Sequence, residues 1–64
     1  MDIGTQVLLA RRKKKMTQKE VAEKVGIYPE SISQIETGKN YPRVNTIKKL
    51  AEVLETVFVI GGEE

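Results

Sequence analysis

The sequence contains no cysteine, no histidine and no tryptophan. Without cysteine the chain cannot form disulfides, thiolate metal sites or a nucleophilic thiol, and without histidine it lacks imidazole acid–base chemistry. No apolar run approaches the length of a membrane-spanning helix. The apolar segment VLLA precedes the basic run RRKKK, whereas a secretory leader has the opposite order. We therefore expect a cytoplasmic protein with no membrane partner.

The chain is short and lacks the residue constellations of an enzyme. Its 64 residues suffice for one domain, and a domain of this size buries only about 60% of its unfolded surface. It shows no paired carboxylates placed for catalysis, no nucleophile–base set and no glycine-rich phosphate loop. We therefore expect no enzymatic activity, cofactor, metal or small-molecule substrate. Because small domains often need reinforcement, we expect a second copy of the chain to supply it.

Charge is unevenly distributed along the sequence, although the net charge is only +2. All 11 basic residues lie between Arg11 and Lys49, where four glutamates oppose them and leave a net charge of +7. The charged residues after Lys49 are all acidic. A basic body is typical of a protein that presents one face to phosphate groups. The run RRKKK is weak evidence by itself, because most charge runs are ordinary solvated surface.

Residues 3–14 and 44–55 have the apolar spacing of helices that cover a core. In the first segment the predicted inward stripe is Val7, Ala10, Arg11 and Lys14. In the second segment it is Ile47, Leu50, Ala51 and Leu54. Each helix is therefore expected to bury one face and to leave the other in solvent.

The segment between Thr17 and Gly38 has the layout of a helix-turn-helix, whose second helix can lie in the major groove of DNA. Thr17 and Glu20 form a capping box that starts the first helix. Gly26 can end this helix in a left-handed conformation, as Gly38 can end the second. Pro29 suits the first position of the second helix. The apolar residues expected to face inward are Val21, Ala22, Val25, Ile27, Ile32 and Ile35.

Residues 56–60, TVFVI, break the helical pattern. They are rich in β-branched and aromatic residues and too few for a stable helix, which predicts a β-strand. An unpaired strand edge invites another chain, so we expect an antiparallel ribbon between two copies across a two-fold axis. The dimerisation residues are then Val57, Phe58, Val59 and Ile60. In the alternative interpretation this segment packs on its own helices.

The string MTQKEVAEKVGIYPESISQIETGKNYP resembles the lambda-repressor-like DNA-binding domains, also called the Cro/C1-type or XRE family. The resemblance covers residues 3–54 and includes, outside the string, Ile3, Gly4, Val7, Arg11, Thr46, Ile47, Leu50, Ala51 and Leu54. It implies an all-α fold, a compact four-helix bundle that contains the helix-turn-helix within a DNA-binding domain of residues 1–55. Residues 56–64 are expected to add the C-terminal strand and an acidic tail for dimerisation.

The sequence departs from the family pattern at three places. The predicted strand stands where many relatives have a fifth helix. Lys15 stands at a bend where the family often has glycine, so either its φ angle is strained or the bend differs. Glu30 stands where many relatives carry a neutral or basic residue.

The resemblance also implies which residues contact DNA. They are Gln18, Tyr28, Pro29, Glu30, Ser33, Gln34, Lys39, Asn40 and Arg43. In the family, a glutamine at the position of Gln18 bonds a backbone phosphate and braces the second helix. By position, Gln34 can bond adenine bidentately, and Glu30 can accept a hydrogen bond from cytosine. Arg11 and Glu36 occupy the positions of a structural ion pair.

The remaining contacts involve the loop and the cap of the second helix. Lys39 and Asn40 follow Gly38, where backbone N–H groups and a lysine can hold a phosphate. Arg43 can sense the width of the minor groove or, more simply, pair with a phosphate. Tyr28 replaces the usual Ser or Thr cap, so its hydroxyl reaches a phosphate or its ring lies partly buried beside the turn.

Together these features predict a homodimeric transcriptional regulator of double-stranded DNA, a repressor that reads an inverted repeat with residues 29–37. One alternative is an antitoxin-type regulator with a toxin protein as partner. Another is a protein-interaction module that keeps the fold without binding DNA, which Glu30 and the low net charge favour. Steep weakening of binding by salt distinguishes a DNA-binding protein from such a module.

Overall fold

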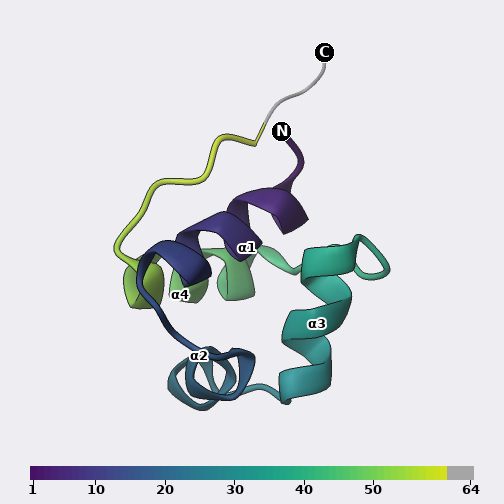
Figure 1. Cartoon of the computed structure of the whole chain (residues 1–64). Helices are drawn as coiled ribbons and strands as arrows, with labels where there is room; N and C mark the ends of the chain where they lie inside the picture. Colours follow the sequence, from purple (N-terminus) through teal and green to yellow (C-terminus); the bar gives the residue numbers. More distant parts are fainter. Residues whose placement is uncertain (61–64) are drawn as a thin grey trace.

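The computed structural model describes residues 1–60 and places four helices in them. They are α1 (Ile3–Lys13), α2 (Gln18–Val25), α3 (Pro29–Thr37) and α4 (Val44–Leu54). The helix α3 packs against α1 and α2, while α4 packs against α2 and α1. Figure 1 shows α1 crossing the bundle, with α3 on one side and α2 at the base. The expected all-helical, four-helix architecture is confirmed.

None of the helices in the part of the chain that the structure describes has the length and apolarity needed to cross a membrane.

The helix ends follow from local sequence. Thr17 and Glu20 form the predicted capping box, in which the Thr17 side chain accepts from Glu20 N and the Glu20 carboxylate accepts from Thr17 N. Gly26 and Gly38 end α2 and α3 with φ angles of 90° and 83°, as predicted. Asp2 caps α1 by accepting from Thr5 N, and this hydrogen bond lowers the pKa of the Asp2 carboxyl.

All four helices contribute side chains to the core. The largest fully buried side chains come one from each helix, namely Val7, Val21, Ile32 and Leu50. Burial of each such side chain contributes about 1.5–3 kcal/mol to stability. Helices of 8 to 11 residues are too short to be stable alone in water, so each one depends on this shared core.

The contact between α1 and α3 is close because α1 carries a glycine there. Gly4 is buried, and a Cβ atom at this position would lie 2.2 Å from the carbonyl oxygen of Ile35 and 3.2 Å from that of Glu36. Backbone atoms cannot move aside as a flexible side chain can. The position therefore excludes every side chain, even that of alanine, unless the two helices separate.

We predict that Gly4→Ala destabilises the fold by about 1–3 kcal/mol, the usual cost of overpacking a well-packed contact. That is a large part of the stability of about 3–10 kcal/mol expected for a domain of this size. Urea unfolding followed by circular dichroism measures the difference. Arg12→Ala, an exposed change on the same helix, should leave the midpoint almost unchanged. Equal midpoints for the two variants would contradict the tight α1–α3 contact.

The strand predicted for residues 56–60 is wrong, because the described part of the chain contains no strand. The segment instead folds back on its own helices (Figure 1). The Gln6 side chain donates to Val59 O and accepts from Val59 N, both at 2.8 Å, so it takes the place of a neighbouring strand. Phe58 packs half-buried against the core. The ribbon between copies is therefore not supported, and the acidic tail at 61–64 lies outside the described residues.

The bend between α1 and α2 contains a non-glycine residue in the left-handed region. Lys15 has a φ of 57°, which matches the strained alternative that the sequence left open at this position. A left-handed conformation costs a residue with a Cβ atom roughly 1–2 kcal/mol. Lys15 tolerates it because the neighbouring backbone is anchored, with Lys15 N and Met16 N donating to Arg12 O and Arg11 O.

We predict that Lys15→Gly stabilises the protein by about 0.5–1 kcal/mol, since relief of the strain exceeds the added entropy of an unfolded glycine. The melting temperature should rise by a few degrees in a scanning calorimeter. Lys15→Ala removes the same charge but keeps the Cβ atom, so it is the matched control and should not gain stability. If both variants melted together, the bend would carry no strain.

Candidate nucleic-acid interface

The helix α3 has one buried face and one face that is open to solvent. Ile32 and Ile35 are buried against the core, whereas Pro29 and Glu30 are exposed. Ser33 and Gln34, further along the open face, are half-buried. The expected division of α3 into an inward and an outward face is therefore present, and the outward residues are those predicted to face base edges.

The turn that positions α3 is short and anchored to α2. Ile27 lies half-buried against the core, and its backbone N donates to Ala22 O at 3.0 Å. Tyr28 then serves as the N-cap of α3 without a side-chain hydrogen bond. The residue is 78% exposed, so the interpretation of Tyr28 as a partly buried ring is wrong.

An ion pair attaches the C-terminal end of α3 to α1. Arg11 donates to the Glu36 carboxylate through two nitrogens, Nε to Oε2 at 2.6 Å and Nη2 to Oε1 at 3.1 Å. A third nitrogen of Arg11, Nη1, donates to Met16 O at 2.9 Å. The side chains are only 13% and 4% exposed. The hydrogen bond to the Glu36 carboxylate raises the pKa of the Arg11 guanidinium.

Gln18 completes this network from the start of α2. Its Nε2 donates to Oε1 of Glu36 at 3.0 Å, so one carboxylate joins side chains of α1, α2 and α3. This contact supplies the bracing role that the resemblance implies for Gln18. The carbonyl oxygen of the same amide has no protein partner among the described residues, and the phosphate contact remains a prediction.

The loop after α3 folds back and forms hydrogen bonds with the end of α3. Lys39 N and Asn40 N donate to Gln34 O at 2.9 and 3.2 Å. The Asn40 side chain also donates through Nδ2 to Oε1 of Gln34. From the sequence, Gln34 is predicted to contact a base and Asn40 a phosphate, independently of each other. The structure brings these two side chains together, which sequence reasoning missed.

The two cations predicted to bind phosphate lie on either side of this loop. Lys39 is exposed, and Arg43 is the exposed N-cap of α4 with no side-chain hydrogen bond to the helix. The first N–H groups of α4 are therefore free of a capping side chain, next to the arginine. A helix N-terminus of this kind favours an anion.

Tyr41 is a surface residue that the sequence analysis did not single out. Its ring is 67% exposed, and with Asn40 and Arg43 it lines a shallow hollow between α3 and α4. A tyrosine can offer both an apolar ring and a hydroxyl to a ligand. Its place in a basic loop before a proline was the available signal in the sequence.

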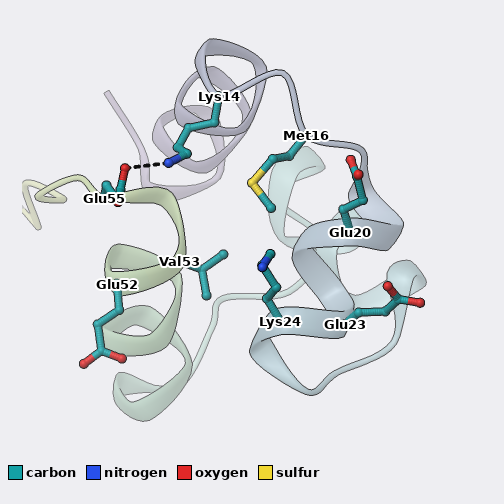
Figure 2. Close-up of a pocket in the computed structure, with 8 residues that line it drawn as sticks. All are labelled: Lys14, Met16, Glu20, Glu23, Lys24, Glu52, Val53 and Glu55. Atoms are coloured by element: carbon teal, nitrogen blue, oxygen red, sulfur yellow. Dashed lines mark hydrogen bonds and ion pairs between the residues drawn. The ribbon is translucent and has the colours of Figure 1, made fainter.

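A larger hollow than the one beside Tyr41 lies elsewhere, between α2 and α4 (Figure 2). Met16 and Val53 supply its apolar lining. Two of its carboxylates already serve the fold, since Glu20 belongs to the capping box and Glu55 pairs with Lys14 at 2.5 Å. That lysine lowers the pKa of the Glu55 carboxyl. Glu20 and Glu55 thus have structural partners, and the open face of α3 holds more of the residues predicted to bind a ligand.

Comparison with known protein families assigns the chain to one of them. The model of the helix-turn-helix family matches residues 7–57, most of the chain. The chain belongs to the helix-turn-helix family. The resemblance that the sequence showed to the XRE type of this family is thereby confirmed.

Two relatives of this helix-turn-helix protein are named as transcriptional regulators. Two proteins from Archaeoglobus fulgidus, each called an uncharacterized HTH-type transcriptional regulator, are 38% and 36% identical to it. The alignments cover 94% of this chain and 91% and 90% of the relatives. A solved structure of SinR, described as the master regulator for biofilm formation in complex with DNA, is also similar. It has a TM-score of 0.81 at 28% identity and covers 88% of this chain and 90% of that one.

We predict that Arg11→Ala and Glu36→Ala each destabilise the fold by about 3–5 kcal/mol, because each leaves one buried charge without its partner. The double variant should lose less than the sum of the two, since no unpaired charge remains. Chemical unfolding of all three variants measures this coupling. Lys14→Ala breaks the exposed pair with Glu55 and should cost far less. Additive losses would contradict a stabilising ion pair between Arg11 and Glu36.

Proposed function

We propose that this protein is a sequence-specific transcriptional regulator that binds double-stranded DNA as a homodimer and represses by occupying a promoter. The observation that carries the proposal is the open face of α3, braced from behind by the Arg11–Glu36–Gln18 network. The similarity to SinR, which was solved with DNA, supports the same use of the fold. The family and the fold are those of a regulator rather than an enzyme.

In the proposed complex α3 enters the major groove with its N-terminus leading. Pro29, Glu30 and Ser33 then face base edges, because they lie on the first turns of the open face. Lys39 and Arg43 lie beyond the other end of α3, where they can pair with phosphates on the flanking backbone. Contacts to the bases carry the specificity, and contacts to the phosphates carry most of the affinity.

A second copy of the chain is the partner that best fits the exposed apolar surface. Large apolar side chains are exposed on α1 and on the segments at both ends of the described chain, namely Met1, Leu9, Val57, Val59 and Ile60. The C-terminal segment leaves α4 on the side opposite α3 (Figure 1). Pairing through these side chains leaves α3 of each copy free. Two such helices about 34 Å apart read an inverted repeat.

We predict that footprinting upstream of the protein's own gene shows two protected half-sites about one helical turn apart. Affinity should fall steeply with salt, and Lys39→Ala and Arg43→Ala should each reduce the slope of log K against log salt by about 1. Lys24→Ala removes a cation from the hollow between α2 and α4 and should leave the slope unchanged. Equal binding of random and promoter DNA, or none, would favour a protein-interaction module instead.

A further inference from the structure

Asn40 contacts Gln34 through both its backbone and its side chain. Asn40 N donates to Gln34 O at 3.2 Å, and Asn40 Nδ2 donates to Gln34 Oε1. Gly38, with a φ of 83°, reverses the chain so that residue 40 returns to residue 34. The backbone bond places the Asn40 side chain, and the side-chain bond then sets the orientation of the Gln34 amide.

The orientation of this amide decides which hydrogen-bonding group meets a ligand. A glutamine amide carries one carbonyl oxygen, which accepts, and one NH2 group, which donates twice. These two groups point in different directions within one plane. Oε1 already accepts from Asn40, whereas Nε2 makes no hydrogen bond among the described residues, so Nε2 is the group of this amide left for a ligand. Gln34 thus presents donors rather than a donor and an acceptor together.

We infer that Asn40 is a positioning residue that makes Gln34 read a hydrogen-bond acceptor in the major groove, the O6 and N7 of guanine or the O4 of thymine. This inference rests on the proposed function. It replaces the bidentate bond to adenine expected from the sequence, since that bond requires Oε1 to face the adenine amino group. It also gives Asn40 a role in base selection in place of a phosphate contact.

The test is selection of half-sites from a randomised library, carried out with the wild type and with Asn40→Ala. The wild type should select guanine or thymine at one position per half-site, and Gln34→Ala should lose that preference. Asn40→Ala frees the amide, so adenine should gain about tenfold at this position relative to the wild type. Lys39→Ala, a change to the neighbouring residue, should weaken all sequences alike and leave the preference intact.

Two further measurements separate failure of this inference from failure of the proposed function. With purine nucleotide, which lacks the 6-amino group, in place of adenine, Asn40→Ala should lose its gain while the wild type stays unaffected. In the free protein, Asn40→Ala should shift the side-chain amide resonances of Gln34 in a 15N spectrum. Selection of adenine by the wild type would overturn the inference and leave DNA binding intact. No duplex binding by the wild type would overturn both, whatever the amide spectrum shows.

Discussion

The carboxylate of Glu36 is the constraint on which the presentation of α3 depends. It is almost fully buried, and it accepts hydrogen bonds from Arg11 on α1 and Gln18 on α2. A buried charge is tolerated only when its partners satisfy it, and here both oxygens are occupied. Arg11 also donates to Met16 O in the bend, so the network reaches the connection between α1 and α2. Three helices are therefore held in one orientation by a single side chain.

A second constraint acts at the other end of α1. Gly4 meets the backbone at Ile35 and Glu36, while Arg11, two turns further along α1, reaches back to the Glu36 side chain. The close backbone contact sets the distance between α1 and α3, and the ion pair sets their relative rotation. Both act on the buried side of α3. Its opposite face makes no core contact over the first turns and is open for the proposed contacts with DNA.

Local features of this fold could be predicted from the sequence, and features that depend on distant contacts could not. The capping box at Thr17 and the left-handed end of α3 at Gly38 each depend on a few adjacent residues. The ion pair came only from a family resemblance, because 25 residues separate its members. The prediction of a strand at 56–60 was wrong because β propensity depends on the surroundings of a segment. Here Gln6 on α1 forms hydrogen bonds with Val59, and Phe58 packs against the core.

The charge of α3 shows why the network matters for the proposed role. The helix carries two glutamates and no cation, so by itself it would be repelled by phosphate. Arg11 pairs with the buried Glu36, which leaves Glu30 as the one exposed charge on a helix whose other outward-facing residues are neutral. Attraction must then come from flanking cations such as Lys39 and Arg43. In the proposed complex, the loop and the start of α4 would therefore supply the affinity, and α3 would supply the selection of bases.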